Sequence, residues 1–132
     1  MAEQKGKPHI TKTAMALLYV KATPEGKFDF DKSKRLLAEM AAMPASLLDY
    51  QIILDVRDVK SVMSVADQWY LAEQLFDYRE TLTRKMAVLC PYEQIDNKKF
   101  FALCARNRGF MVRAFTSFEE AVEWLIAKEP DI

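Results

Sequence analysis

Few side chains in this sequence combine the types and spacing that catalysis requires. Its 132 residues include one histidine, His9, which excludes a histidine-based catalytic triad and a multi-histidine metal site. Cys90 and Cys104 lie 14 positions apart without a CxxC pattern, so we expect two buried, reduced thiols rather than a disulfide or a zinc site. The three glycines are too dispersed for a phosphate-binding glycine loop.

Asp55 and Asp58 are the residues best placed for acid–base chemistry. Asp55 lies near the end of an apolar run, QIILDV, and Asp58 follows it, at the sheet edge where α/β proteins place their sites. No serine, cysteine or lysine nucleophile has a base beside it in the sequence. We therefore expect no catalytic residue, no cofactor and no enzymatic activity, and interpret both aspartates as structural partners of Arg57 or Lys60.

Ser64 opens a Ser-Val-Ala-Asp segment with the pattern of a helix capping box. Its hydroxyl is expected to accept a hydrogen bond from the backbone amide of Asp67, which stabilises a helix by about 1 kcal/mol. A phosphate would also be stabilised there, because free amide groups and the positive end of the helix dipole surround it. Ser64 is thus a helix cap, with phosphorylation as the alternative role.

The helix predicted over residues 65–78 carries more aromatic residues than one buried stripe can hold. In one interpretation Trp69 and Phe76 belong to the core; in the other, Trp69, Tyr70 and Phe76 contact a ligand, a membrane or a second copy of the chain. Four residues share the predicted stripe: Val65, Trp69, Ala72 and Phe76.

Charge is balanced overall but segregated along the chain. The 19 basic and 19 acidic residues exclude a protein that binds nucleic acid through bulk positive charge. Residues 84–113 nevertheless hold seven basic and two acidic side chains, with acidic stretches on either side. The helix predicted over residues 96–107 carries Lys98, Lys99 and Arg106 beside Phe101. These residues are candidates for contact with anionic lipid or an acidic partner, the alternative being a solvated face.

The pattern of apolar runs and helix signals predicts an α/β domain over residues 12–132, after a flexible tail over 1–11. We expect about five strands and four helices, with a mostly parallel sheet and one antiparallel hairpin at the N-terminus. The hairpin is predicted to pair residues 13–22 with 27–30. The other strands are expected over 51–56, 85–90 and 110–115. The remaining helices are expected from Asp31 as cap to about residue 42, and from Ser117 onward.

This order of elements resembles the STAS fold of bacterial anti-sigma factor antagonists. The resemblance rests on the N-terminal hairpin, the Ile-Leu-Asp-Val strand at 53–56 and the serine-capped helix after it. The Arg-Asn-Arg-Gly segment at 106–109, the strand at 111–115 and the helix Glu-Glu-Ala-Val-Glu-Trp-Leu at 119–125 are more similar still to the SpoIIAA-like branch of these proteins. The similarity covers roughly residues 13–127.

The resemblance implies association rather than catalysis. SpoIIAA-like proteins are expected to bind an apolar or lipid-like ligand such as a fatty acid, or a membrane surface, with the two middle helices as a mobile cover. The anti-sigma branch implies instead a switch that binds a protein partner and is phosphorylated at the position of Ser64. There Met63, Val65 and Ala66 depart from the Asp-Ser-Ser-Gly motif of that branch. We further expect a bacterial, cytoplasmic protein, peripheral at the membrane if it docks there, which could form a homodimer and binds no metal.

Overall fold

The computed structural model describes residues 9–13, 17–22, 27–43 and 50–127. Its main sheet contains β1 (His9–Lys12), β2 (Leu17–Lys21), β4 (Gln51–Asp55), β6 (Met86–Leu89) and β7 (Val112–Phe115). A separate two-stranded sheet contains β3 (Lys27–Phe28) and β5 (Lys60–Ser61). The helices are α1 (Phe30–Ala41), α2 (Val65–Gln74), α3 (Ile95–Asn107) and α4 (Phe118–Ile126), with short 3₁₀ turns η2 (Leu75–Tyr78) and η3 (Tyr92–Gln94).

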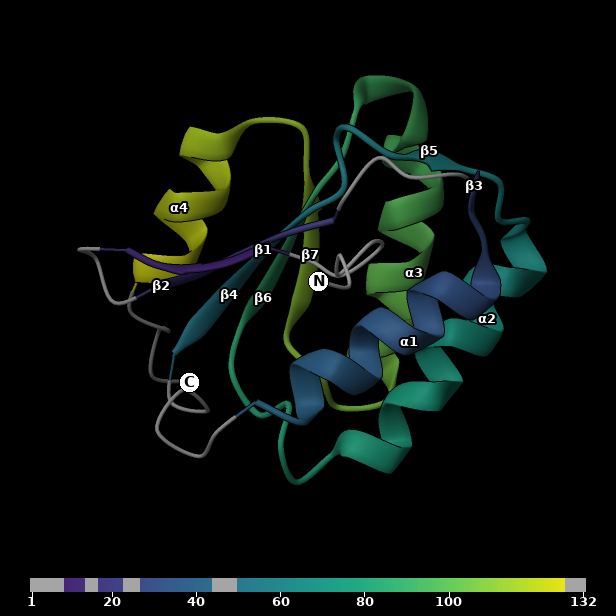
Figure 1. The fold of residues 1–132 in the computed structure, drawn as a ribbon, viewed down its shortest axis with the longest axis horizontal. Helices are drawn as coiled ribbons and strands as arrows, with labels where there is room; N and C mark the ends of the chain where they lie inside the picture. The colour runs from purple at the N-terminus through teal and green to yellow at the C-terminus, as the bar shows by residue number, and fades with distance from the viewer. Residues whose placement is uncertain (1–8, 14–16, 23–26, 44–49, 128–132) are drawn as a thin grey trace, which may run out of the picture.

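The main sheet separates one helix from the other three. Its strand order is β1-β2-β4-β6-β7; α4 covers one face and α1, α2 and α3 cover the other (Figure 1). β1 and β2 pair antiparallel, and the remaining neighbours pair parallel. The expected α/β architecture with an N-terminal hairpin is therefore confirmed.

The prediction of which segments form the hairpin was wrong. The first strand of the hairpin is β1, which lies partly within the expected tail, and β3 pairs in parallel with β5 instead of returning along β2. β1 is an edge strand with one neighbour, so it needs no continuous apolar run, and its polar sequence concealed it. Residues 9–11 thus belong to the domain.

Helix ends follow the local signals with one shift. Ser64 and Asp67 form the predicted capping box, with Asp67 N donating to Ser64 Oγ over 3.1 Å and Ser64 N donating to Asp67 Oδ2 over 3.0 Å. α1 is capped by Asp29 rather than Asp31, because Asp29 Oδ1 accepts from Lys32 N at 3.0 Å. Gly109 ends α3 with φ +93°, the left-handed conformation that a residue without Cβ adopts at least cost.

The central strands are buried on both faces, as the unbroken Ile-Ile-Leu of β4 predicts. Ile52 and Leu54 belong to the core under α1–α3, and Ile53 belongs to the core under α4. The larger core, on the α1–α3 side, surrounds the cavity that forms the candidate site.

Candidate functional site

A small cavity lies between the main sheet and helices α1, α2 and α3. Its volume is about 30 Å³, room for about two water molecules. Leu54 and Val56 place it near the carboxyl end of β4, where open parallel sheets usually bind ligands. Nine apolar residues line it: Phe28, Leu36, Leu37, Leu54, Val56, Met63, Leu71, Val88 and Phe101. Three polar residues complete the wall: Ser33, Gln68 and Lys98.

Gln68, on the buried side of α2, is the least satisfied of these polar groups. Its side chain is 0% exposed, and neither Oε1 nor Nε2 has a hydrogen-bond partner in the described part of the chain. An unpaired buried amide opposes folding by about 1–3 kcal/mol, so native proteins seldom retain one unless something pairs with it. Gln68 thus lines the cavity with a side chain whose amide is unpaired among the described residues.

Ser33, on α1, has only a weak partner. Its hydroxyl is buried and donates to the thioether sulfur of Met63 at 3.3 Å. A thioether is a poor acceptor compared with a carbonyl or carboxylate. Ser33 therefore lacks a strong hydrogen-bond acceptor among the described residues.

Lys98, near the start of α3, places an ammonium group in the same apolar surroundings. It is 4% exposed, and its Nζ lies 3.4 Å from Ser61 Oγ. No acidic side chain among the residues with described positions forms an ion pair with it. Burial lowers the pKa of Lys98 to about 8, because the charged form loses its hydration.

Cys90, which follows β6, is the titratable neighbour that affects the pKa of Lys98. The thiol is fully buried, and burial raises its pKa to about 11 although the nearby Lys98 lowers it. A thiol held in its neutral form is a poor nucleophile and metal ligand. Cys90 and Cys104 are both free and buried, as expected.

The sequence signals for this site were weak. Ser33 and Gln68 are common polar residues within helices, and only the register of Gln68 with Leu71 and Leu75 indicates that it faces inward. Lys98 and Phe101 were expected to form a surface with Lys99 and Arg106. They lie instead on the buried side of α3 and line the cavity. The prediction that these two residues are exposed was therefore wrong.

Three aromatic residues of α2 and η2 lie outside the core, whereas Tyr78 packs against it. Trp69 is 40% exposed, Tyr70 53% and Phe76 50%. Arg108 lies over the Trp69 ring at 5.0 Å and Arg79 over the Phe76 ring at 4.1 Å. The predicted stripe was therefore correct at Ala72 and wrong at Val65, Trp69 and Phe76. The interpretation that Trp69 and Phe76 are core residues was also wrong. The buried positions are Gln68, Leu71, Ala72 and Leu75.

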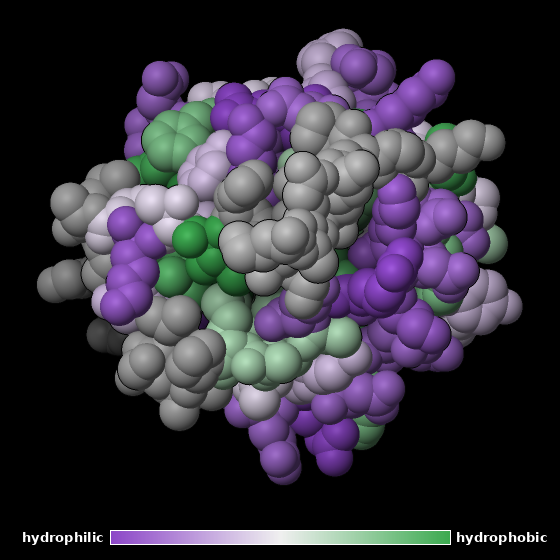
Figure 2. Space-filling view, in the orientation of Figure 1, coloured by the Kyte–Doolittle hydropathy of each residue, from purple (hydrophilic) through white to green (hydrophobic). Residues whose placement is uncertain are grey.

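Lys99 and Arg106, the basic residues expected to form a surface with these aromatic side chains, do not join them. Lys99 and Arg106 are exposed on α3, and Arg106 Nη1 donates to Val112 O at 2.9 Å, toward β7. Asn97, which donates to Met63 O just before α2, and Arg108, which contacts Trp69 of α2, are about 160° away from them around the helix. The view in Figure 2 shows a mostly hydrophilic surface over α1 and α2, with small separate hydrophobic areas. The expected continuous basic and aromatic surface is absent from the described residues.

Ser64 is exposed at the N-terminus of α2. Its hydroxyl accepts the Asp67 amide, which leaves the oxygen engaged in the capping box. The structure thus confirms the capping role and places the hydroxyl at the protein surface.

Asp55 forms a polar cluster on the other face of the sheet, beside α4. Arg57 donates to its carboxylate from Nη2 at 2.9 Å, Nε at 3.1 Å and the backbone N at 3.0 Å, and the Tyr19 hydroxyl donates to Oδ2. Burial by itself raises the pKa of Asp55, but the hydrogen bonds from Arg57 and Tyr19 outweigh it and hold the pKa below its usual value. Asp58 pairs with Lys21 at 2.8 Å rather than with Lys60. Asp55 is thus fully satisfied, as a structural residue should be.

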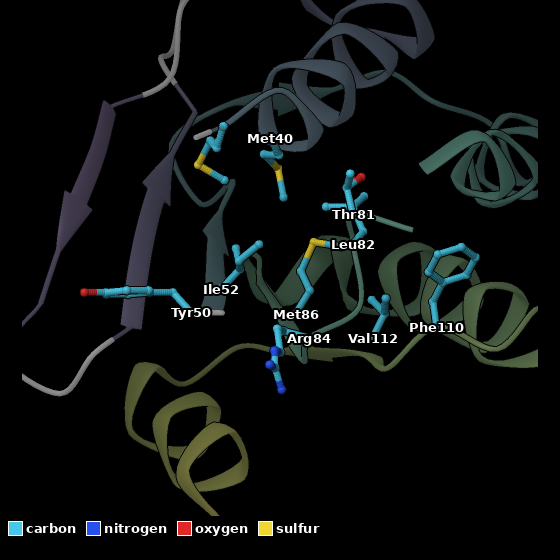
Figure 3. Close-up of a pocket in the computed structure, with 10 residues that line it drawn as sticks. Met40, Tyr50, Ile52, Thr81, Leu82, Arg84, Met86, Phe110 and Val112 are labelled. Atoms are coloured by element: carbon cyan, nitrogen blue, oxygen red, sulfur yellow. The ribbon is translucent and has the colours of Figure 1, made fainter. Parts of the chain in front are cut away.

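Two further depressions lie away from this site. One, of about 10 Å³, lies at the amino ends of β4, β6 and β7 and is lined by Met40, Ile52, Met86 and Val112 among others (Figure 3). It could hold at most one water molecule. The other is an open depression between the end of α1 and η2. Neither contains a buried unpaired polar side chain among the described residues.

The described residues contain neither a metal-binding group nor a membrane-spanning helix. Within the described ranges, no three His, Cys, Asp or Glu side chains are grouped to hold a metal ion. None of the helices there is long and apolar enough to cross a bilayer.

Comparison with known proteins identifies the fold. No protein-family model matches the chain, and no curated protein matches it. Its structure is similar to the crystal structure of an uncharacterised protein of the DUF3478 family with a SpoIIAA-like fold from Shewanella loihica PV-4. The TM-score is 0.53 at 16% identity, over 95% of this chain and 98% of the other. At this identity the likeness concerns the fold alone, and the chain has a SpoIIAA-like fold.

Proposed function

We propose that this protein is a non-catalytic binding module that holds a small, partly apolar ligand in the cavity beneath α1, α2 and α3. The observation that carries the proposal is the cavity itself, which is walled almost entirely by apolar atoms, with the buried Gln68 among its lining residues. Ligand sites typically combine an apolar lining with a few polar groups of this kind.

A ligand larger than two water molecules requires movement of the cover. Helix α2 is the element we expect to move, because Gln68 sits on its buried side and its unpaired amide opposes closed packing. Val65 on the same helix is largely exposed and adds little to its packing on the core. Pairing of Gln68 by the ligand would then stabilise the bound state.

We favour this cavity over docking on an anionic membrane. Lys99 and Arg106 lie on the flank of α3 away from α2, whereas Trp69 and Tyr70 lie on α2. Acidic Asp67 and Glu73 accompany the aromatic residues. Membrane binding by a basic amphipathic helix needs the basic and apolar groups on adjoining faces.

A phosphorylation switch that controls a protein partner is the second candidate function. The observation that favours it is the exposed hydroxyl of Ser64 at the N-terminus of α2, the proposed cover of the cavity. A phosphate there would interact with free amide groups of the helix. The test is an intact-mass measurement of protein isolated from several growth states; the switch requires a phosphorylated form that Ser64→Ala abolishes.

The binding function is tested on the purified full-length chain. Thermal denaturation is measured with short-chain acids, alcohols and alkanes, and material released on denaturation is identified by mass spectrometry. A bound ligand raises Tm with concentration, because it stabilises only the folded state. Ser33→Leu, which fills the cavity, should reduce the rise, and Lys34→Leu, on the exposed side of α1, should not. If no probe raises Tm and nothing is released, the proposed function is wrong.

A further inference from the structure

Exposed apolar side chains are concentrated on α2 and the residues beside it. Ten large apolar side chains of the described chain are at least 40% exposed, and half of them lie within residues 62–76. These are Val62 (45%), Val65 (57%), Trp69 (40%), Tyr70 (53%) and Phe76 (50%). An exposed apolar patch on a soluble protein often marks an interaction site. The patch lies on the outer side of α2, away from the cavity.

Most of these residues form a strip along one side of the helix. Val65, Trp69, Glu73 and Phe76 follow one another at intervals of four, four and three residues, a spacing that places them on one helical face. Tyr70 widens the strip, because its ring meets that of Trp69 edge-on with 5.2 Å between the centroids. We call these five residues the α2 strip. Glu73 is its one charged member.

Two opposite charges lie at the middle of the α2 strip without a counter-ion. Arg108, which follows α3, lies over the Trp69 ring at 5.0 Å and donates to Cys104 O at 3.0 Å. Glu73 is exposed one helical turn beyond Trp69. Among the residues with described positions, no ion pair involves either Arg108 or Glu73.

We propose that the α2 strip binds the same strip of a second copy of this chain, with the two α2 helices antiparallel. A twofold axis between Trp69 and Glu73 brings Trp69, and the guanidinium of Arg108 over it, opposite Glu73 of the second copy. The same axis brings Val65 near Phe76 of the second copy. Apolar groups then meet apolar groups, and two Glu73–Arg108 pairs form across the axis, as a self-complementary twofold interface requires.

A second copy fits this surface better than an anionic membrane does. Glu73 and the nearby exposed Asp77 would be repelled by anionic lipid. A partner of a single charge would pair with either Glu73 or Arg108 and leave the other unmatched. The strip itself presents one charge of each sign, so its complement is another copy of the same strip.

The test measures the molecular mass of the full-length chain by sedimentation velocity at increasing protein concentration. We expect a monomer–dimer equilibrium for the wild type. Glu73→Arg and Arg108→Glu should each weaken the dimer at least about tenfold, because each places like charges opposite one another. An equimolar mixture of the two variants should restore wild-type association, since both charge pairs are then of opposite sign. Glu123→Arg, exposed on α4 at the other face of the sheet, is the matched control and should change nothing.

The wild type decides the proposal without any variant. If it stays monomeric up to about 1 mM, the proposed dimer is wrong. A monomer that instead sediments with anionic vesicles would assign the strip to a membrane surface.

The variants decide whether the contact is the one proposed. A dimer that withstands both substitutions forms through another surface, and monomeric variants whose mixture also stays monomeric would contradict the Glu73–Arg108 pairing. A variant that is unfolded by circular dichroism is replaced by Glu73→Gln or Arg108→Gln, each of which should still weaken the dimer. None of these measurements involves the cavity, so the proposed ligand-binding function stands or fails separately.

Discussion

The ammonium group of Lys98 lies 3.4 Å from the hydroxyl of Ser61, and that hydroxyl is its one hydrogen-bond partner in the described structure. The two residues belong to α3 and β5, so the contact joins a helix of the cavity wall to the small second sheet. A single neutral oxygen compensates little of the hydration that a lysine loses on burial. Lys98 consequently opposes folding when charged.

Lys98→Met is expected to stabilise the protein at neutral pH, by an amount that shrinks at alkaline pH. The pKa of Lys98 is about 8 in the folded state and about 10.4 in an unfolded chain. Between these values the unfolded state binds more protons, so the lysine's unfavourable contribution decreases as pH rises. Urea denaturation followed by circular dichroism at pH 7 and pH 10 measures the difference between variant and wild type.

The measured quantity is the difference in free energy of unfolding between variant and wild type, because the titration of Cys90 changes stability with pH in the opposite direction to that of Lys98. Its pKa is about 11 when folded and about 8.5 when unfolded, so its contribution to stability decreases across that interval. Both proteins contain Cys90, and its effect largely cancels in the difference. Lys34→Met, on the exposed side of α1, is the control for the removal of a lysine. A Lys98→Met difference that stays constant from pH 7 to pH 10 would contradict the assignment of a lowered pKa.

Gln68→Leu is expected to raise the free energy of unfolding by about 1–3 kcal/mol, because it removes an unpaired buried amide without removing volume. Gln74→Leu on the same helix should change it by less than about 0.5 kcal/mol, since Gln74 is only partly buried. Urea denaturation at pH 7 without added ligand compares the two. A destabilised Gln68→Leu variant would mean that the amide is already paired in the free protein.

Asp55→Asn should destabilise the protein by about 1–3 kcal/mol at pH 7, because the buried side chain loses the charge of its hydrogen bonds with Arg57 and Tyr19. Asp58→Asn is the control: its ion pair with Lys21 is exposed and should contribute less than about 1 kcal/mol.

The effect of Asp55→Asn should also depend on pH. Because the pKa of Asp55 is lowered on folding, its stabilising contribution is complete above the unfolded value of about 3.9 and is lost as pH falls through the folded value. Wild type and Asp55→Asn should therefore converge in stability below about pH 4. Acid denaturation curves that remain separated by a constant amount would argue against this linkage.

Ser64→Ala should cost about 1 kcal/mol, because the Asp67 amide loses its acceptor. Ser64→Asp should restore most of that loss, since aspartate is an equally good N-cap. Thermal denaturation of the three proteins measures both effects. Equal Tm values for serine and alanine would show that the cap contributes nothing.

Phe76→Ala and Leu75→Ala, neighbours in η2, should differ sharply. Leu75 is fully buried, and its truncation should cost about 2–5 kcal/mol. Phe76 is 50% exposed and should cost about 1 kcal/mol or less, including its contact with Arg79. Comparable losses from the two variants in urea denaturation would place Phe76 in the core after all.

Local sequence patterns determined the elements whose causes are local. The Ser64–Asp67 capping box, the end of α3 at Gly109 and the doubly buried strand β4 each depend on a few adjacent residues, and each was predicted. The parallel architecture also followed, because strands that alternate with helices require crossover connections.

Tertiary structure alone decided the hairpin partner, the buried face of α2 and the site. β1 was hidden because an edge strand needs no apolar run. The apolar residues Val65, Trp69 and Phe76 suggested one face of α2, yet packing against α1 and α3 turned that helix so that Gln68 faces inward. Ser33, Gln68 and Lys98 lie far apart in the sequence, on three different helices. Only the packing of these helices on one sheet makes the three residues line a common cavity. No periodicity within a helix encodes which polar residue will lack a partner, because that depends on what the neighbouring elements place opposite it.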